Sequence, residues 1–305
     1  MSNEICIVSA FFNINREGWD RFERTSDEYL DYFFCWARLK NLLIVYVETE
    51  KLKNKILEFR EEIGLKDKTI VHIIEDFRNI DFELYESIKK ATENEIQKGA
   101  RLFKKNPEVW NADYNYVMLL KMWCVQDAVS RGEAKGLVSW VDFGYNHGGD
   151  VIDKDSNFNF TWKYDFPKKI NLFLIQQLDD KPMFDIVCTM DTYIMGTVIV
   201  GIDFLWNEFW LLVRSSMISL NDVGLTDDDQ NIILMAYRKR PEIFETYLSN
   251  WQMQLKQFGG SHLLLKESNT RYSLVKKVYK RFIKLKICFN YAVRIFTYVR
   301  KKDVH

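Results

Sequence analysis

Short apolar runs alternate with amphipathic stretches through the first half of the chain. Continuous apolar, β-branched runs predict strands, and stretches whose apolar residues recur three and four positions apart predict helices. The predicted strands cover 5–12, 42–47, 69–74 and 137–141, and the predicted helices cover 26–40, 52–63, 84–103 and 114–130. This alternation predicts an α/β fold with a mostly parallel central sheet and flanking helices.

The second half of the chain continues with a glycine-containing apolar run. Residues 191–201 read as a strand that carries Gly196 and Gly201, followed by a Trp- and Phe-rich helix over 204–217. The two glycines either open space for a sugar or serve as ordinary turn and packing glycines. A further helix is predicted over 232–237.

Charge is distributed unevenly along the chain, although 43 Lys and Arg balance 43 Asp and Glu. The stretch 271–302 holds 11 basic and no acidic residues, which leaves 32 basic and 43 acidic residues elsewhere. Its apolar positions recur at helical spacing, so it predicts basic amphipathic helices that contact an anionic membrane surface. Alternatively, it packs on the domain with solvated charges. Nucleic acid is not an expected partner, because the acidic body would repel it.

These features predict a catalytic domain over 1–265 and a basic helical tail over 266–305. Five scattered cysteines without a CxxC pair argue against a zinc ribbon or a disulfide framework and favour a reducing compartment. The sequence shows no secretory signal, and its longest apolar run, 192–202, is too short to span a bilayer. We therefore expect a cytoplasmic protein, peripheral on the inner face of the cell membrane.

The end of the predicted strand 137–141 is the first place to look for a ligand, because α/β sheets bind ligands at the carboxyl ends of their strands. Asp142-Phe143-Gly144 follows this strand. A carboxylate there can hold Mg²⁺ or Mn²⁺ against phosphates, and Gly144 would let the backbone approach closely. Equally, Asp142 can cap a turn in which Gly144 supplies a positive φ.

An acidic cluster, Thr226-Asp227-Asp228-Asp229, precedes the helix predicted over 232–237. Thr226 and Asp229 fit a capping box, and acids at a helix start suit the helix dipole. Asp228 or Asp229 could instead act as a general base at a pocket rim. GxGxxG, Walker A and GxSxG motifs are absent from the sequence, which argues against the commonest nucleotide sites and against an α/β-hydrolase.

Several separated motifs, from the N-terminus to about residue 250, resemble the HtrL/YibB family of bacterial proteins. The motifs are Ser9-Ala10-Phe11-Phe12, Gly18-Trp19, 24–30, Trp110-Asn111 through Lys121, 140–144 and Asp229-Gln230. The family is glycosyltransferase-like and is found near lipopolysaccharide-core and capsule genes. The resemblance implies an A-type, Rossmann-like glycosyltransferase fold with a divalent metal at an Asp-x-Asp motif. Here that motif is Asp142-Phe143-Gly144, in which glycine replaces the second acid.

The resemblance also implies roles for individual residues. Asp142 would hold the metal, with His262 as a C-terminal ligand and His147 as a second candidate, unless these histidines are structural. The nucleotide-sugar site would be bordered by Ala10 and Phe11 and include Arg24, Asn115, Lys121, Asp142, Gly144 and Gly196. Asn115 and Lys121 are candidates for the diphosphate or the donor sugar, although Lys121 reads equally as a snorkelling surface lysine.

The expected function is therefore metal-dependent transfer of a sugar from a nucleoside diphosphate donor, most simply UDP, to a cell-surface polysaccharide or lipid-linked glycan. Cations would stabilise the leaving diphosphate. If configuration is inverted, Asp228 or Asp229 would deprotonate the acceptor. Two alternatives stay open: a noncatalytic sugar- or lipid-binding protein with a degenerate transferase fold, and a glycoside hydrolase with paired carboxylates.

Overall fold

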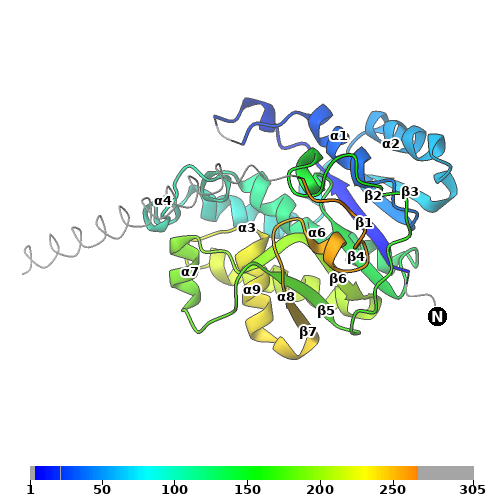
Figure 1. The fold of residues 1–305 in the computed structure, drawn as a ribbon. Helices are drawn as coiled ribbons and strands as arrows, with labels where there is room; N and C mark the ends of the chain where they lie inside the picture. The colour runs from blue at the N-terminus through cyan, green and yellow to red at the C-terminus, as the bar shows by residue number, and fades with distance from the viewer. Residues whose placement is uncertain (1–3, 21, 267–305) are drawn as a thin grey trace, which may run out of the picture. The chain divides into compact units, whose positions relative to one another are not determined.

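A seven-stranded sheet forms the centre of the computed structural model, which describes residues 4–20 and 22–266. The strands follow the order β3-β2-β1-β4-β6-β5-β7 (Figure 1). Their bounds are β1 Cys6–Phe11, β2 Leu43–Val47, β3 Thr69–Ile73, β4 Leu137–Val141, β5 Ile170–Leu174, β6 Ile194–Ile202 and β7 Phe244–Leu248.

The sheet is mostly parallel, as the sequence predicts. Strands β3, β2, β1 and β4 run parallel, β6 is antiparallel to both β4 and β5, and β7 is parallel to β5. From β1 the chain winds first toward β2 and β3 and later returns to the other side as β4. The order therefore reverses between β1 and β4, and such a switch point leaves a crevice at the carboxyl ends of the two strands.

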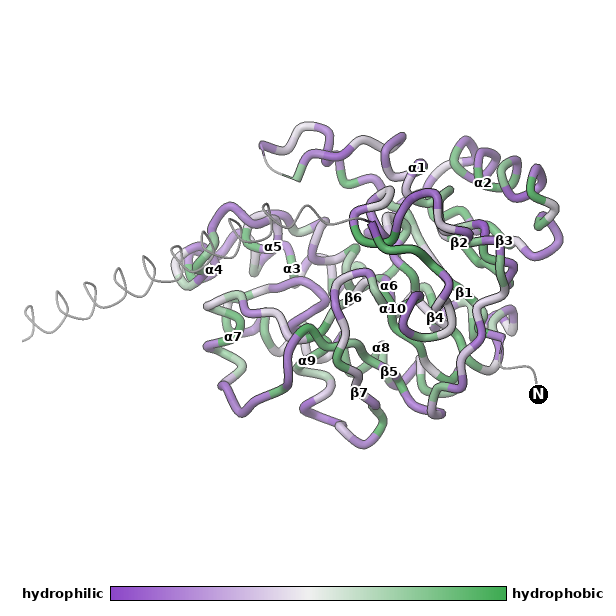
Figure 2. Tube along the Cα trace, viewed as in Figure 1, coloured by the Kyte–Doolittle hydropathy of each residue, from purple (hydrophilic) through white to green (hydrophobic). Residues whose placement is uncertain are grey.

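Helices cover both faces of the sheet, so the central strands are buried on both sides. In β2, Ile44 and Tyr46 pack into the core of one face, whereas Leu43, Val45 and Val47 pack into the core of the other. One face carries α3 Phe82–Glu93, α6 Ala112–Ser130, α8 Trp206–Asn221 and α9 Asp229–Lys239, and the other carries α1 Ser26–Trp36, α2 Glu50–Glu62 and α10 Gln254–Gln257. The hydropathy colouring follows this arrangement, with hydrophobic residues along the central strands and hydrophilic ones along the peripheral loops (Figure 2).

Three short helices complete the described α-helices, and one of them corrects a prediction. They are α4 Glu95–Ala100, α5 Pro107–Trp110 and α7 Met183–Thr189. The helix predicted over 84–103 is divided into α3 and α4 at Asn94, whose side chain accepts a hydrogen bond from the Ile96 N–H at 2.9 Å. This side-chain cap satisfies the first turn of α4, so Asn94 begins a new helix instead of continuing α3.

The predicted basic tail, 271–302, lies outside the described residues, as does all of the predicted second domain except Lys266. The predictions of amphipathic helices and of membrane contact there stay predictions. Within 4–20 and 22–266, no helix is both long enough and apolar enough to cross a bilayer.

Candidate functional site

A cavity of about 310 Å³ opens at the carboxyl ends of β1 and β4. Its walls come from segments far apart in the sequence: the end of β1 and the loop after it, the start of α1, α6, the loop after β4, the first half of β6 and the start of α9. The cavity thus occupies the switch point of the sheet, where this class of fold binds its ligands.

Asp142 is held at the mouth of this crevice by the two strands beside it. It follows β4 directly, and its backbone N–H donates to the Thr197 carbonyl on the antiparallel strand β6 at 2.8 Å. The Trp140 indole N–H donates to the Asp142 carboxylate at 2.7 Å. The side chain of Asp142 is 28 % exposed, so this carboxylate can reach a ligand in the cavity.

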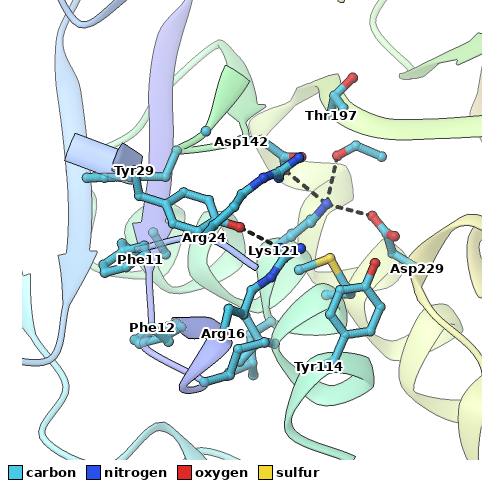
Figure 3. Close-up of a pocket in the computed structure, with 18 of the residues that line it drawn as sticks. Phe11, Phe12, Arg16, Arg24, Tyr29, Tyr114, Lys121, Asp142, Thr197 and Asp229 are labelled. Carbon is cyan, nitrogen blue, oxygen red and sulfur yellow. Dashed lines mark hydrogen bonds and ion pairs between the residues drawn. The ribbon is translucent and has the colours of Figure 1, made fainter. Parts of the chain in front are cut away.

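Lys121 projects from α6 into the space between two carboxylates (Figure 3). Its ammonium lies 2.9 Å from Asp142 Oδ1, 2.8 Å from Asp229 Oδ2 and 3.1 Å from the Gly196 carbonyl. The side chain is only 5 % exposed. Burial by itself would lower the pKa of Lys121, but the charges of Asp142 and Asp229 outweigh burial and hold this pKa above its ordinary value. The lysine therefore stays protonated and is not a snorkelling surface residue.

Asp229 reaches Lys121 because Gly196 leaves room for it. Asp229 is the first residue of α9, and its side chain is 3 % exposed. A Cβ atom added to Gly196 would lie 1.8 Å from Asp229 Oδ2. Burial raises the pKa of Asp229, and the Lys121 charge opposes that rise. Glycine at 196 is thus needed for the close approach of a carboxylate to the β6 backbone.

Two arginines from the segment between β1 and α1 line the cavity and supply positive charge. The Arg16 guanidinium donates to the Tyr29 hydroxyl at 2.5 Å and to the Phe22 carbonyl at 2.9 Å. The Arg24 guanidinium lies 3.3 Å from His147 Nε2, and Thr25, the next residue, is the N-cap of α1 with a complete capping box. Among the residues that the structure describes, no carboxylate forms an ion pair with either arginine.

His147 lines the cavity with both ring nitrogens engaged. Besides the Arg24 contact at Nε2, Nδ1 lies 3.2 Å from the Gln252 amide nitrogen and 3.4 Å from Asp150 Oδ2. Burial and the neighbouring Arg24 charge lower the pKa of His147 below its ordinary value. The ring is therefore neutral at physiological pH.

Aromatic rings form a further wall. Phe11, at the end of β1, has its ring centroid 5.1 Å from those of both Tyr29 and Phe143. A Cβ atom at Gly144 would lie 2.9 Å from the Tyr29 ring, so glycine after Phe143 lets α1 approach the loop after β4. The Asp142-Phe143-Gly144 motif thus combines an accessible carboxylate, a ring packed against Phe11 and a close contact with α1.

Most of the residues predicted from the sequence meet in this cavity. Its lining includes Ala10, Phe11, Arg24, Lys121, Asp142, Gly144, Gly196 and Asp229. It also includes residues that the sequence reasoning missed, among them Arg16, Tyr29, Tyr114, Trp140, Thr197 and Gln230. Arg16 lies two residues before the Gly18-Trp19 motif, and Tyr29 lies inside the motif 24–30. The family motifs were therefore the signal that could have pointed to both residues.

Three predicted site residues lie outside the lining of the cavity. Asn115 is buried, and its amide donates to the Glu108 carbonyl at 2.9 Å, which ties α6 to α5. Asp228 is the N-cap of α9, and its carboxylate accepts a hydrogen bond from the Gln230 N–H at 3.2 Å. The predicted capping box of Thr226 with Asp229 is therefore wrong, because the helix begins at Asp229 itself. His262 is exposed, lies 3.1 Å from the Asn157 carbonyl and packs edge-on against Phe160.

The described residues offer no three-ligand protein site for the expected divalent metal. Across 4–20 and 22–266, no group of three or more His, Cys, Asp or Glu side chains could enclose an ion. His262 is not near Asp142 in the cavity lining, and Asp142 already faces the Lys121 ammonium. A cation on this carboxylate would be repelled by the lysine charge beside it.

Comparison with known proteins assigns the chain to a family. A family model described as "Bacterial protein of unknown function (HtrL_YibB)" matches residues 3–260. The chain belongs to the HtrL/YibB family. The curated relative Protein HtrL of Escherichia coli (strain K12) is 32 % identical over 295 residues, which is 91 % of this chain and 100 % of the relative. The predicted resemblance is confirmed, and since the family's description assigns no activity, the function has to be argued from the cavity.

Proposed function

We propose that the protein is a glycosyltransferase that moves a sugar from a nucleoside diphosphate donor to a cell-surface or lipid-linked glycan. The observation that carries this proposal is the composition of the cavity at the β1–β4 switch point. One wall is aromatic, two arginines without carboxylate partners among the described residues face the space, and the Asp142 carboxylate is within reach. In this proposal the aromatic wall meets the base, the two arginines meet the diphosphate, and the Asp142 carboxylate meets the sugar.

We place the nucleoside on the side formed by Phe11 and Tyr29, whose rings pack 5.1 Å apart and border the cavity with partly apolar surface suited to a flat base. UDP is the simplest donor for a cavity of about 310 Å³, because a pyrimidine is the smaller kind of base. The mostly parallel sheet is compatible with the A-type transferase fold, to which we assign the chain on the family resemblance.

The chemistry follows from where charge develops. As the bond between sugar and diphosphate breaks, negative charge grows on the leaving phosphate oxygens, and positioned guanidinium groups stabilise that charge. Arg16 and Arg24 would take this role. The hydrogen bond from Trp140 and the ion pair with Lys121 both end on Asp142 Oδ1, so Oδ2 would accept from a hydroxyl of the donor sugar.

Asp229 is the remaining candidate for the acceptor base, because Asp228 caps α9 outside the cavity lining. Burial raises the pKa of Asp229, which suits a base, but Lys121 binds its Oδ2 atom. This pairing favours a second candidate function, a noncatalytic nucleotide-sugar-binding protein whose carboxylates only position the ligand. Turnover separates the two candidates.

The acceptor is most simply membrane-borne, because the tail carries 11 basic and no acidic residues over 271–302. Such a segment is attracted to an anionic leaflet, by up to about 1 kcal/mol for each charge near the surface. Replacing Lys276, Lys277 and Lys280 by Gln should weaken cosedimentation with phosphatidylserine vesicles at physiological salt. Unchanged cosedimentation would remove this role from the tail.

The proposal is tested by incubating the full chain with a panel of UDP-, GDP- and dTDP-sugars and measuring release of the free nucleotide. We expect slow release from one class of donor without an acceptor, because water replaces the acceptor hydroxyl. Binding of a nucleotide sugar without any turnover, also after addition of glycan acceptors, would favour the noncatalytic candidate. Binding of none of these donors would reject both.

A further inference from the structure

We infer that this cavity binds the diphosphate of its ligand without a divalent metal, because Lys121 takes the cation's place between the two carboxylates and Arg16 and Arg24 meet the phosphates. The inference deepens the proposed function and takes its ligand class from it. It departs from the metal site that the family resemblance implies at Asp142 and His262.

The Lys121 ammonium is surrounded by oxygen atoms, as a bound metal ion would be. Its ammonium contacts an oxygen of each of two acidic side chains and a backbone carbonyl at 2.8–3.1 Å, which are the kinds of oxygen that a hard cation would use. The side chain is 5 % exposed, so solvent screens these contacts poorly. The inner end of the cavity is thus already occupied by a permanent positive charge that belongs to the chain.

The contacts with Gly196 and Asp142 also fix Lys121 in place. The Gly196 carbonyl is part of β6, and Asp142 is tied to the same strand through its backbone bond to Thr197. The Trp140 indole N–H shares Asp142 Oδ1 with the lysine. A metal at Oδ1 would have to displace both donors, and a metal at Oδ2 would lie beside the ammonium.

The side chains that line the cavity carry a net positive charge that is available to a ligand. The side chains lining the cavity include the cations Lys121, Arg16 and Arg24 against the carboxylates Asp142 and Asp229, with His147 held neutral by burial and by Arg24. Lys121 is used by the carboxylates, whereas the two arginines have no carboxylate partner among the described residues. A guanidinium pair matches the fork geometry of phosphate oxygens, so the net positive charge selects a diphosphate without added metal.

The test measures binding of inorganic pyrophosphate to the full chain by calorimetry, in EDTA and again in Mn²⁺. We expect binding in EDTA that Arg24→Gln and Arg16→Gln each weaken by about tenfold or more, as the loss of a charged hydrogen-bond donor implies. Arg38→Gln is the matched control, because Arg38 is exposed and lies outside the cavity lining. Melting temperatures of all variants establish that they are folded.

Three binding results would overturn the inference. The first is no pyrophosphate binding in EDTA, and the second is binding that neither arginine variant weakens. The third is a Mn²⁺-induced gain in affinity that Asp142→Asn abolishes, since it would place the metal on this carboxylate. The outcome is separate from that of the proposed function. Pyrophosphate bound in EDTA without turnover of any nucleotide sugar would defeat the transferase alone, whereas turnover strictly dependent on Mn²⁺ would defeat this inference alone.

Discussion

The carboxylate of Asp229 lies against the backbone of Gly196, where an added Cβ atom would be 1.8 Å from Oδ2. Gly196→Ala should therefore push Asp229 away from Lys121. We expect a loss of about 1–3 kcal/mol in the free energy of unfolding, the usual result of overpacking. Urea unfolding measures this loss.

Gly99→Ala is the control for that substitution. Gly99 lies in α4, and a Cβ atom there would meet no atom within 4 Å. Alanine should stabilise this helix by roughly 0.5–1 kcal/mol, because glycine is a poor helix former. If Gly196→Ala lowered the free energy of unfolding no more than Gly99→Ala does, the close approach of Asp229 to Gly196 would not restrict residue 196 to glycine.

Removing the cation at the centre of the site should be costly. Lys121→Met keeps most of the side-chain volume but leaves Asp142 and Asp229 facing each other without a partner, and breaking a buried pair typically costs about 3–5 kcal/mol. Adding Asp229→Asn in the double variant should recover part of that loss. A single variant with wild-type stability in urea would show that the ion pairs contribute little.

Much of the site could be predicted because its residues stand next to regular elements. The run 42–47 is continuous and apolar, and 137–141 is interrupted only by Ser139, so Asp142 could be placed at a strand end from the sequence alone. The pairing of Lys121 with Asp229 could not, because the two residues are 108 positions apart and no local pattern connects them. The preference for His262 over His147 comes from the family resemblance, although His147 follows Asp142 in the segment after the strand 137–141.

The strands β5 and β7 were also missed, for a physical reason. β5 carries Asn171, a poor strand former, which is tolerated because its amide donates to the Val200 carbonyl on β6 and to nearby loop carbonyls. β7 reads Phe-Glu-Thr-Tyr-Leu, too short and too polar to stand out. β5 is specified by tertiary pairing with β6 and β7, and β7 by pairing with β5, which periodicity does not reveal.

Substitutions at Asp228 and Asp229 should distinguish helix capping from a role in ligand chemistry. Asp228→Ala removes the N-cap of α9 and should cost about 1 kcal/mol, while Asp228→Ser should restore most of that stability. Neither should change nucleotide-sugar turnover, which Asp229→Asn should lower. If Asp228→Ala reduced turnover and stayed fully stable, Asp228 would belong to the site instead of the cap.

His147 should make stability depend on pH near neutrality. Burial and Arg24 lower its pKa below the ordinary value of 6.5, so the unfolded chain binds more protons than the folded one in that range. The stabilising contribution is complete above pH 6.5 and is lost as the pH falls below it. His147→Asn, which suits the left-handed backbone at φ 41°, should shrink the drop in urea midpoint between pH 7.5 and 5.5. An equal drop in both proteins would contradict the assignment.

The most direct test of the central claim is the initial rate of nucleotide release from the best donor, compared between the wild-type protein and Asp142→Asn. Asp222→Asn, an exposed change at the end of α8, is the matched control. We predict that Asp142→Asn lowers the rate by about tenfold to a hundredfold at a temperature where its melting curve shows it fully folded, as expected for losing a charged hydrogen bond to the donor. A rate within twofold of both the wild type and the control would contradict a nucleotide-sugar site at this cavity.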